Sequence, residues 1–139
     1  MFQRILVPTD LTDRTVRALQ VAGSLAVAPL PQVTLLHVIE TIAGADFEEL
    51  SSFYGTMERR ARERMSDLLA RTPGRRGEID VAIVYGGRTE EVLRFTRENG
   101  IDLIVLASHP VDPSKPFSGL GTMSYKLGIL APCAVLLVK

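Results

Sequence analysis

Short apolar runs alternate with stretches of helical spacing along almost the whole chain, and this alternation is the strongest constraint on the fold. The apolar runs predict five buried strands, at residues 4–7, 33–39, 79–85, 103–106 and 133–138. Such continuous apolarity suits parallel strands covered on both faces. Repeated strand–helix–strand units cross over right-handedly, so we predict an α/β fold with a mostly parallel, doubly wound sheet.

Four helices are predicted between these strands. Thr12 or Asp13 caps the first helix, whose buried face is expected to consist of Val16, Leu19, Gly23 and Ala26. One long amphipathic helix is expected from residue 46 to about residue 72, followed by a shorter helix capped by Thr89. The last helix opens at residues 121–122 and carries apolar side chains at Met123, Leu127 and Leu130.

Length, charge and cysteine content narrow the classes of protein that fit. The 139 residues, 46% of them hydrophobic, suffice for one domain over residues 1–139 and are too few for two of ordinary size. Sixteen basic residues balance sixteen acidic ones, which argues against nucleic acid or an anionic membrane as a partner. With neither a membrane span nor a signal peptide in the pattern, a cytoplasmic protein is expected. Cys133, alone in an apolar run, is expected to be a small core residue.

One basic segment is interpreted as structural. The four arginines at positions 59, 60, 62 and 64 interleave with Glu58 and Glu63, and no aromatic residue lies among them. A solvated helix face is therefore expected here instead of a nucleic-acid patch.

The residues that could bind or react with a ligand lie directly after the predicted strands. In a doubly wound sheet the ligand crevice lies outside the carboxyl ends of the strands, where the strand order reverses. The residues at these ends are Thr9 and Asp10, Val38 to Glu40, Gly86 and Gly87, and Ala107, Ser108 and His109. The first N–H groups of the last helix, at residues 121–122, have no partners within that helix and favour an anion.

These groups suit an adenine nucleotide, although a structural interpretation explains them equally well. Asp10 can accept hydrogen bonds from ribose hydroxyls, backbone near Val38 can pair with an adenine edge, and Gly121 with Thr122 can hold phosphate. Alternatively, Asp10 only caps a helix and Gly121 only lets the last helix pack closely. The local pattern leaves both open.

Catalysis has weaker support than binding. Asp10, Ser108 and His109 can be drawn as a hydrolytic constellation, but no nucleophile elbow or other catalytic spacing accompanies them. His37 is expected in the core or in the crevice wall, and no ligand spacing indicates a metal site. Any enzyme activity is limited to slow ATP hydrolysis without an identifiable general base.

Four segments together resemble the universal stress protein family. They are MFQRILVPTD at residues 1–10, VTLLHVI at 33–39, DLIVLASH at 102–109, and Gly-Thr at 121–122 followed by LAPCAVLLVK at 130–139. The resemblance covers nearly the whole chain, and the joint order of the segments is specific. It implies the strand order 3-2-1-4-5, with Asp10 and Ala107 meeting at the reversal. It also implies a homodimer joined through the last strand, which fits an apolar edge at 134–138.

Many members of this family bind ATP through a loop of the form Gly, two residues, Gly, nine residues, Gly-Ser or Gly-Thr. By resemblance, Asp10 and Val38 match the ribose and adenine positions. The implied start of the phosphate-binding helix is Gly121, Thr122, Met123 and Ser124. The implied cofactor-binding set is completed by Pro8, Thr9, Ala107 and His109.

The loop of this chain departs from that form. Its two glycine positions fall on Ala107 and Pro110, and ten residues separate Pro110 from Gly121. Three prolines, at positions 110, 113 and 116, lack N–H donors, and Asp112 repels phosphate unless a cation intervenes, although Lys115 adds a compensating charge. A family subgroup with a similar loop is also described as binding nucleotide.

The expected function is that of a stress-response protein that binds ATP or AMP, with magnesium accompanying the nucleotide. The alternative is a dimeric interaction module that binds no nucleotide and whose crevice is filled by the loop or by a partner.

Overall fold

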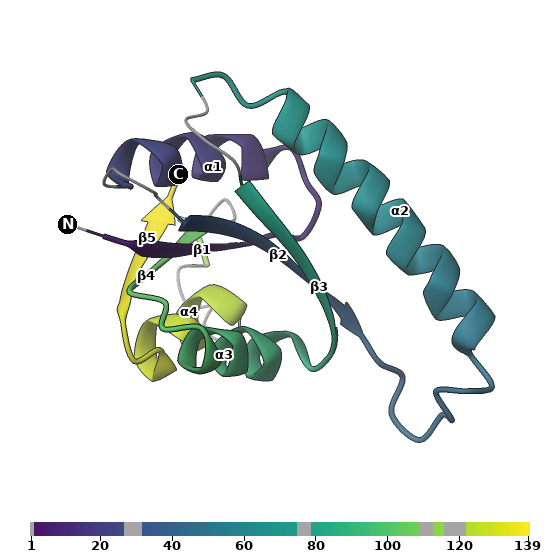
Figure 1. Cartoon of the computed structure of the whole chain (residues 1–139). Helices are drawn as coiled ribbons and strands as arrows, with labels where there is room; N and C mark the ends of the chain where they lie inside the picture. The colour runs from purple at the N-terminus through teal and green to yellow at the C-terminus, as the bar shows by residue number, and fades with distance from the viewer. Residues whose placement is uncertain (1, 27–31, 75–78, 109–112, 116–121) are drawn as a thin grey trace.

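The structure, a computed structural model, describes residues 2–26, 32–74, 79–108, 113–115 and 122–139, and over these residues five strands alternate with four helices (Figure 1). The strands are β1 (Arg4–Pro8), β2 (Gln32–Glu40), β3 (Ile79–Gly86), β4 (Leu103–Ala107) and β5 (Ala134–Val138). The helices are α1 (Arg14–Leu25), α2 (Ser51–Ala70), α3 (Arg88–Glu98) and α4 (Met123–Leu130).

The five strands form one parallel sheet in the order β3-β2-β1-β4-β5. This confirms the predicted doubly wound sheet and its strand order. Val7 of β1 lies opposite Leu35 of β2 on one side, and Leu6 lies opposite Ile104 of β4 on the other. The chain thus builds outward from β1 in both directions, and the order reverses between β1 and β4.

Each face of the sheet has its own hydrophobic core, because successive strand side chains point to opposite faces. Figure 1 shows α1 and α2 on one face, with α3 and α4 on the other. The core under α1 and α2 includes Ile5, Val7, Leu19, Leu35 and Met65. The core under α3 and α4 includes Leu6, Leu36, Val92, Ile104 and Leu127. Burying a side chain of this size contributes about 1.5–3 kcal/mol, so these two cores hold the helices against the sheet.

The predictions for α1 are only partly right: Asp13 occupies the N-cap position without a capping hydrogen bond from its side chain, and of the four residues predicted for the buried face only Leu19 is buried. The helix buries Thr15, Ala18, Leu19 and Ala22, and no side chain caps its first turn. The Thr12 hydroxyl donates instead to the Asp10 carboxylate at 2.6 Å, and the Asp13 carboxylate accepts from Arg64 of α2 and from Arg71, which follows α2. Thr15 turns inward because its hydroxyl lies 2.7 Å from that of Thr9, which rotates the buried face away from Val16.

The predicted start of α2 is also wrong, because the helix begins at Ser51 and not at Asp46. The Asp46 carboxylate accepts a hydrogen bond from the Glu48 N–H at 2.9 Å, a turn that competes with helix formation. Phe47 in this turn stacks on Tyr54 with ring centroids 5.0 Å apart. The apolar spacing of α2 therefore extends to residues before Ser51, although the helical backbone begins only at Ser51.

The cap expected for α3 is displaced. Gly87 occupies the N-cap position with an extended backbone, so Thr89 lies inside the helix and caps nothing. Gly86 before it has φ +144°, a conformation that glycine adopts readily, and the chain turns there from β3 into α3. The structure thus moves the helix start to Arg88.

Two further observations on the described residues concern the burial of Cys133 and the length of the helices. Cys133 is half-buried ahead of β5, and burial raises the pKa of its thiol, as suits a small residue at the core edge. None of the helices found in the described part of the chain has the length and apolar content needed to cross a bilayer.

Candidate functional site

A crevice lies at the carboxyl ends of β1 and β4, where the strand order reverses. It contains one cavity of about 300 Å³ and another of about 80 Å³. Pro8, Asp10, Arg88 and Met123 line both cavities, so the two lie side by side. Pockets for small molecules begin at about 300 Å³. The crevice therefore has the position and the size of a small-molecule site.

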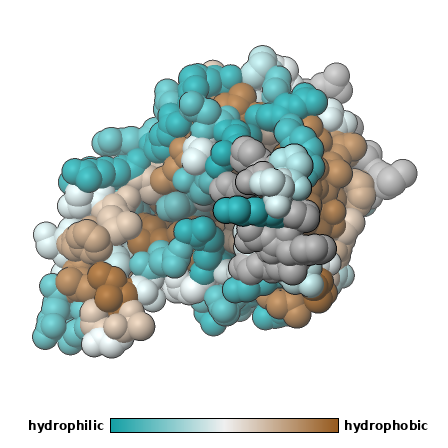
Figure 2. Space-filling view, turned by 180° about the vertical axis from the view of Figure 1, so that it is seen from behind, coloured by the Kyte–Doolittle hydropathy of each residue, from teal (hydrophilic) through white to brown (hydrophobic). Residues whose placement is uncertain are grey.

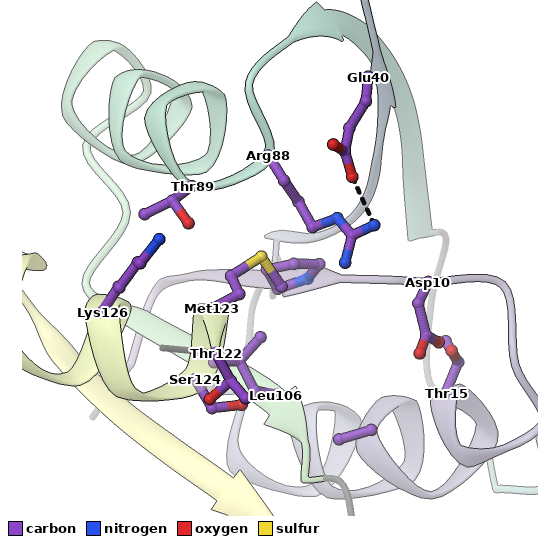
Figure 3. A pocket seen from close by; sticks show the side chains of 12 residues that line it. Asp10, Thr15, Glu40, Arg88, Thr89, Leu106, Thr122, Met123, Ser124 and Lys126 are labelled. Carbon is purple, nitrogen blue, oxygen red and sulfur yellow. Dashed lines mark ion pairs between the residues drawn. The ribbon is translucent and has the colours of Figure 1, made fainter. Parts of the chain in front are cut away.

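The larger cavity is bounded by the beginnings of two helices (Figure 3). Met123 and Ser124 open α4, while Arg88 and Thr89 open α3. The first N–H groups of a helix lack partners within it, and the helix dipole favours negative charge at this end. Lys126 of α4 reaches toward Thr89 across the same space. The part of the cavity beside the two helix starts therefore favours an anionic group, whereas Asp10 lies on the opposite side.

The start of α4 is capped by Thr122. Its hydroxyl accepts a hydrogen bond from the Tyr125 N–H at 3.5 Å, which is a long contact, and its backbone is extended. Among the eight residues of α4, Leu127 is the buried one. The start of this helix is consequently held by a weak cap and by apolar packing, with Leu127 in the core and Met123 packed against it.

Acidic and basic side chains meet at the mouth of the crevice. A guanidinium nitrogen of Arg88 lies 2.6 Å from a carboxylate oxygen of Glu40, and both side chains are about half-exposed. Exposed ion pairs contribute about 0–1 kcal/mol, so Arg88 can exchange Glu40 for a ligand anion at small cost. The Asp10 carboxylate lies 3.5 Å from the Arg14 guanidinium and accepts from the Thr12 N–H at 3.0 Å.

The smaller cavity has a largely apolar wall. Leu36, Val38 and Val92 line it, together with Thr9 and His37. Nδ1 of His37 lies 2.9 Å from the carbonyl oxygen of Thr9, and a carbonyl can only accept, so this nitrogen carries the proton. His37 is thus a residue of the crevice wall, one of the two positions expected for it.

The structure brings together the implied nucleotide-binding set but not every candidate: Gly86, Gly87, Ser108 and Lys115 line neither cavity. All the residues of the implied nucleotide-binding set that the structure describes line one or both cavities. They are Pro8, Thr9, Asp10, Val38, Ala107, Thr122, Met123 and Ser124. His109 and Gly121 lie outside the described residues, as do Pro110, Asp112 and Pro116 of the loop. Parallel pairing brings the described set together, because the carboxyl ends of all five strands meet at one edge of the sheet.

The hydrolytic constellation of Asp10, Ser108 and His109 is not tested, since His109 is outside the described residues. Ser108 accepts a hydrogen bond from the Lys139 ammonium at 3.2 Å. Within the described residues, no group of three or more histidine, cysteine, aspartate or glutamate side chains is arranged to hold a metal ion.

Sequence reasoning missed two cations of the crevice, Arg88 and Lys126. Both left a signal in the sequence. Arg88 directly follows the glycine pair that ends β3, and Lys126 lies four residues after Thr122, on the same face of the helix. A basic residue directly after a strand end, or one turn into the following helix, can therefore indicate a cation of the crevice.

The fold and the crevice define a doubly wound α/β protein with a ligand site at the reversal of its strand order. The chain matches the universal stress protein family over residues 1–139, and it belongs to that family. It is 25% identical to the universal stress protein YxiE of Bacillus subtilis (strain 168) over 150 residues, an alignment that covers 100% of both chains.

Solved structures of the same family share the fold. The universal stress protein UspA from Lactobacillus plantarum is 21% identical, with a TM-score of 0.68 over 99% of this chain and 98% of that one. A universal stress protein from Archaeoglobus fulgidus is 20% identical, with a TM-score of 0.69 and full coverage of both. A universal stress protein in complex with cAMP is 19% identical, with a TM-score of 0.62 over 99% of this chain and 97% of that one.

Proposed function

We propose that the crevice binds ATP or a related adenine nucleotide such as AMP, and that the protein acts through this binding in the stress response. The observation that carries the proposal is the joint lining of one crevice by the Asp10 carboxylate, the apolar wall at Val38 and the start of α4. These parts suit a ribose, a flat base and phosphate, respectively. The relative in complex with cAMP supports an adenine nucleotide as the ligand class.

The smaller cavity supplies the position for adenine. Just after β1, the Thr9 N–H donates to the Leu36 carbonyl of β2 at 2.8 Å. Among the described residues this is the last backbone hydrogen bond between the β1 segment and β2. Peptide groups two residues apart on a strand point the same way, so those of Val38 point toward the space beyond the end of β1. They can pair with an adenine edge there, while Val92 and Met123 cover the face of the base.

The start of α4 supplies the position for phosphate. Thr122, Met123 and Ser124 line the larger cavity, and the first N–H groups of the helix have no partners within it. Arg88 and Lys126 add positive charge that offsets the donors lost from the proline-containing loop. When magnesium accompanies ATP, phosphate oxygens and water supply most of its ligands, so no cluster of protein carboxylates is required.

Titration calorimetry with ATP and magnesium, and separately with AMP, tests the site. Asp10→Ala should weaken binding more than about tenfold, because a hydrogen bond to a charged group contributes about 1.5–3 kcal/mol. Asp46→Ala is the matched control, since Asp46 accepts from the Glu48 N–H at 2.9 Å much as Asp10 accepts from Thr12, but on the connection before α2. Wild-type protein that releases no heat with either nucleotide, or equal losses in both variants, would remove the proposed site.

We also propose that two copies join through β5. In Figure 2, hydrophobic surface gathers on the side of the molecule where β5 lies. Leu136 and Leu137 of this edge strand are 36% and 41% exposed, and Ile129 and Leu130 of the neighbouring α4 are 63% and 58% exposed. An apolar edge strand left unpaired invites association, so a second copy pairing with it satisfies both the backbone and the side chains.

Native mass spectrometry distinguishes this dimer from other assemblies. Leu137→Lys should convert a dimer into a monomer. Val81→Lys, at a site that is 38% exposed on the opposite edge strand β3, should leave the dimer intact. A monomeric wild type at all concentrations contradicts the proposal. A dimer that releases no nucleotide on denaturation, and gives no heat with ATP, favours the interaction module without nucleotide.

A further inference from the structure

The turn that follows β1 contains a residue in an unusual backbone conformation. Among the described residues other than glycine, Leu11 is the one with a positive φ, at 67°. This left-handed conformation crowds the Cβ atom of a leucine against its own backbone, and it persists only where the surroundings hold it. Leu11 directly follows Asp10, the proposed ribose ligand. The turn is therefore held by contacts beyond its local sequence preference.

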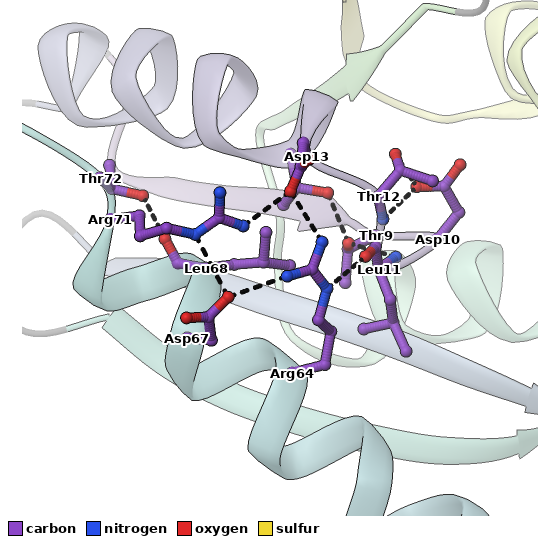
Figure 4. Close-up of polar contacts among 11 residues, drawn as sticks. Thr9, Asp10, Leu11, Thr12, Asp13, Arg64, Asp67, Leu68, Arg71 and Thr72 are labelled. Carbon is purple, nitrogen blue, oxygen red and sulfur yellow. Dashed lines mark hydrogen bonds and ion pairs between the residues drawn. The ribbon is translucent and has the colours of Figure 1, made fainter.

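The side chain of Arg64 in α2 supplies these contacts (Figure 4). Its Nε donates to the Leu11 carbonyl oxygen at 2.9 Å, Nη2 donates to Asp13 at 2.7 Å, and Nη1 donates to Asp67 at 2.8 Å. The guanidinium reaches these three acceptors from three different nitrogens held in one plane, whereas the three donors of a lysine all radiate from a single nitrogen and cannot span them. Arg64 therefore departs from the solvated face expected for the arginines of this segment.

Arg71, which follows α2, closes a ring with the same two carboxylates. It donates to Asp13 at 2.7 Å and to Asp67 at 3.2 Å. The ring joins the end of α2 to the residue that precedes α1, across more than fifty positions of sequence. Arg62 contrasts with Arg64, because it pairs with Glu58 on its own helix at 3.2 Å.

The geometry of Asp10 depends on the same turn. Its carboxylate accepts from the N–H of Thr12 at 3.0 Å and from the hydroxyl of Thr12 at 2.6 Å. The Leu11 N–H donates to the hydroxyl of Thr9 at 2.9 Å. Leu11 lies between Asp10 and Thr12, so its φ determines whether Thr12 can reach the Asp10 carboxylate and hold it at the crevice.

We propose that Arg64 is a positioning residue that holds Leu11 in its left-handed conformation and thereby presents the Asp10 carboxylate to the ribose hydroxyls of a bound nucleotide. The ligand in this inference rests on the proposed function. The dependence of the turn on Arg64 is a property of the protein without ligand and can be measured separately.

Hydrogen exchange on the ligand-free protein tests that dependence. Arg64→Met should accelerate exchange of the Leu11 and Thr12 amides about tenfold or more, because their bonds to Thr9 and Asp10 open more often. Arg62→Met, which removes an arginine of the same helix, should leave these amides unchanged. Unchanged exchange in Arg64→Met would overturn the proposal.

Nucleotide selectivity tests the consequence for the site. Arg64→Met should weaken ATP about tenfold, and weaken 2′,3′-dideoxy-ATP less than about threefold, because the latter has no ribose hydroxyls for Asp10. In an Asp10→Ala background the Arg64 substitution should have no further effect. Equal losses for both nucleotides, or wild-type affinity for ATP, would contradict positioning.

A second variant guards against a general loss of structure. Arg64→Lys keeps a positive charge beside Asp13 and Asp67 but lacks the forked donors, so it should melt within about 2 °C of wild type and show the same selective loss. Wild-type selectivity in Arg64→Lys would contradict the role of the fork. If wild-type protein binds neither nucleotide, the proposed function fails, while the exchange experiment still decides whether Arg64 holds the turn.

Discussion

The two walls of the crevice are built in different ways. The wall at residues 9–13 is held by polar contacts from within its own turn and from the distant helix α2. The wall at residues 122–126 is held by the long contact between Thr122 and Tyr125 and by the burial of Leu127. The first wall thus has many specific polar contacts, whereas the second has one weak cap and the apolar packing of Leu127 and Met123.

This difference indicates which half of the site is formed before a ligand arrives. A polar network whose members all have partners holds a single geometry. A helix of eight residues is marginal by itself and depends on its packing. We therefore expect the wall at residues 9–13 to be pre-organised, and the wall at residues 122–126 to gain order if the proposed nucleotide binds.

The largest expected effect comes from the apolar anchor of the α4 wall. Leu127→Ala should lower the free energy of unfolding by about 2–5 kcal/mol, because Leu127 is fully buried between α4 and the sheet. Leu130→Ala, on the same helix but 58% exposed, should change it by less than about 0.5 kcal/mol. Urea denaturation measures both. Similar values for the two variants would show that α4 is not anchored as described.

A smaller loss of stability is expected from a substitution in the wall at residues 9–13. The hydroxyls of Thr9 and Thr15 are buried and lie 2.7 Å apart, so Thr15→Val leaves a buried hydroxyl short of one partner and should cost about 1–3 kcal/mol. Thr56→Val, which removes an exposed hydroxyl bonded to the Ser52 carbonyl within α2, serves as control and should cost less than about 0.5 kcal/mol. Chemical denaturation compares the two, and equal stabilities would mean that the wall does not depend on this pair.

Removal of the α4 cap should have a modest effect. Thr122→Ala should cost about 0.5–1 kcal/mol, the lower part of the range for N-caps, because the contact to the Tyr125 N–H is long. Thr89→Ala is the comparison, since Thr89 lies within α3 and caps nothing. Thermal unfolding of both variants measures the difference. A loss of 2 kcal/mol or more, on the scale of the strongest caps, would mean that Thr122 holds this wall more firmly than its geometry suggests.

The smallest expected effect is a pH dependence of the free energy of unfolding, which arises from the ring of Asp13, Arg64, Asp67 and Arg71. Hydrogen bonds from Arg71 and Arg64 hold the pKa of Asp13 below its usual value, so the unfolded chain binds a proton more readily than the folded protein. The stabilisation is present above about pH 3.9, the unfolded value, and is lost as the pH falls through the lower folded pKa. Solvent screening keeps it small, because Asp13 is exposed and shares its arginines with Asp67.

Asp13→Asn isolates this contribution. The urea midpoints of wild type and variant should differ most near neutral pH and converge as the pH falls below about 4, because the wild-type carboxyl then becomes protonated. A gap that stays constant down to pH 2 would show that Asp13 contributes through something other than its charge.

Part of the candidate site was open to prediction from the sequence, with help from the family resemblance. Asp10 and Thr122 follow directly from strand-end and helix-start signals, and both line the crevice. Arg88 and Lys126 were not predicted, because they belong to two separate helices and meet at one cavity only after the sheet has formed.

The sequence by itself determined the number and direction of the strands, since continuous apolar runs such as residues 103–106 bury themselves only in a covered parallel sheet. It also located the start of the last helix to within one or two residues, since residues 121–122 were predicted to open it and Thr122 is the N-cap of a helix that begins at Met123. Only the tertiary structure decided that Thr15 and not Val16 faces the core, and that Arg64 reaches Leu11 and Asp13. The physical reason is range: periodicity and capping act within one or two helical turns, whereas these contacts join side chains that become neighbours only after the sheet has formed.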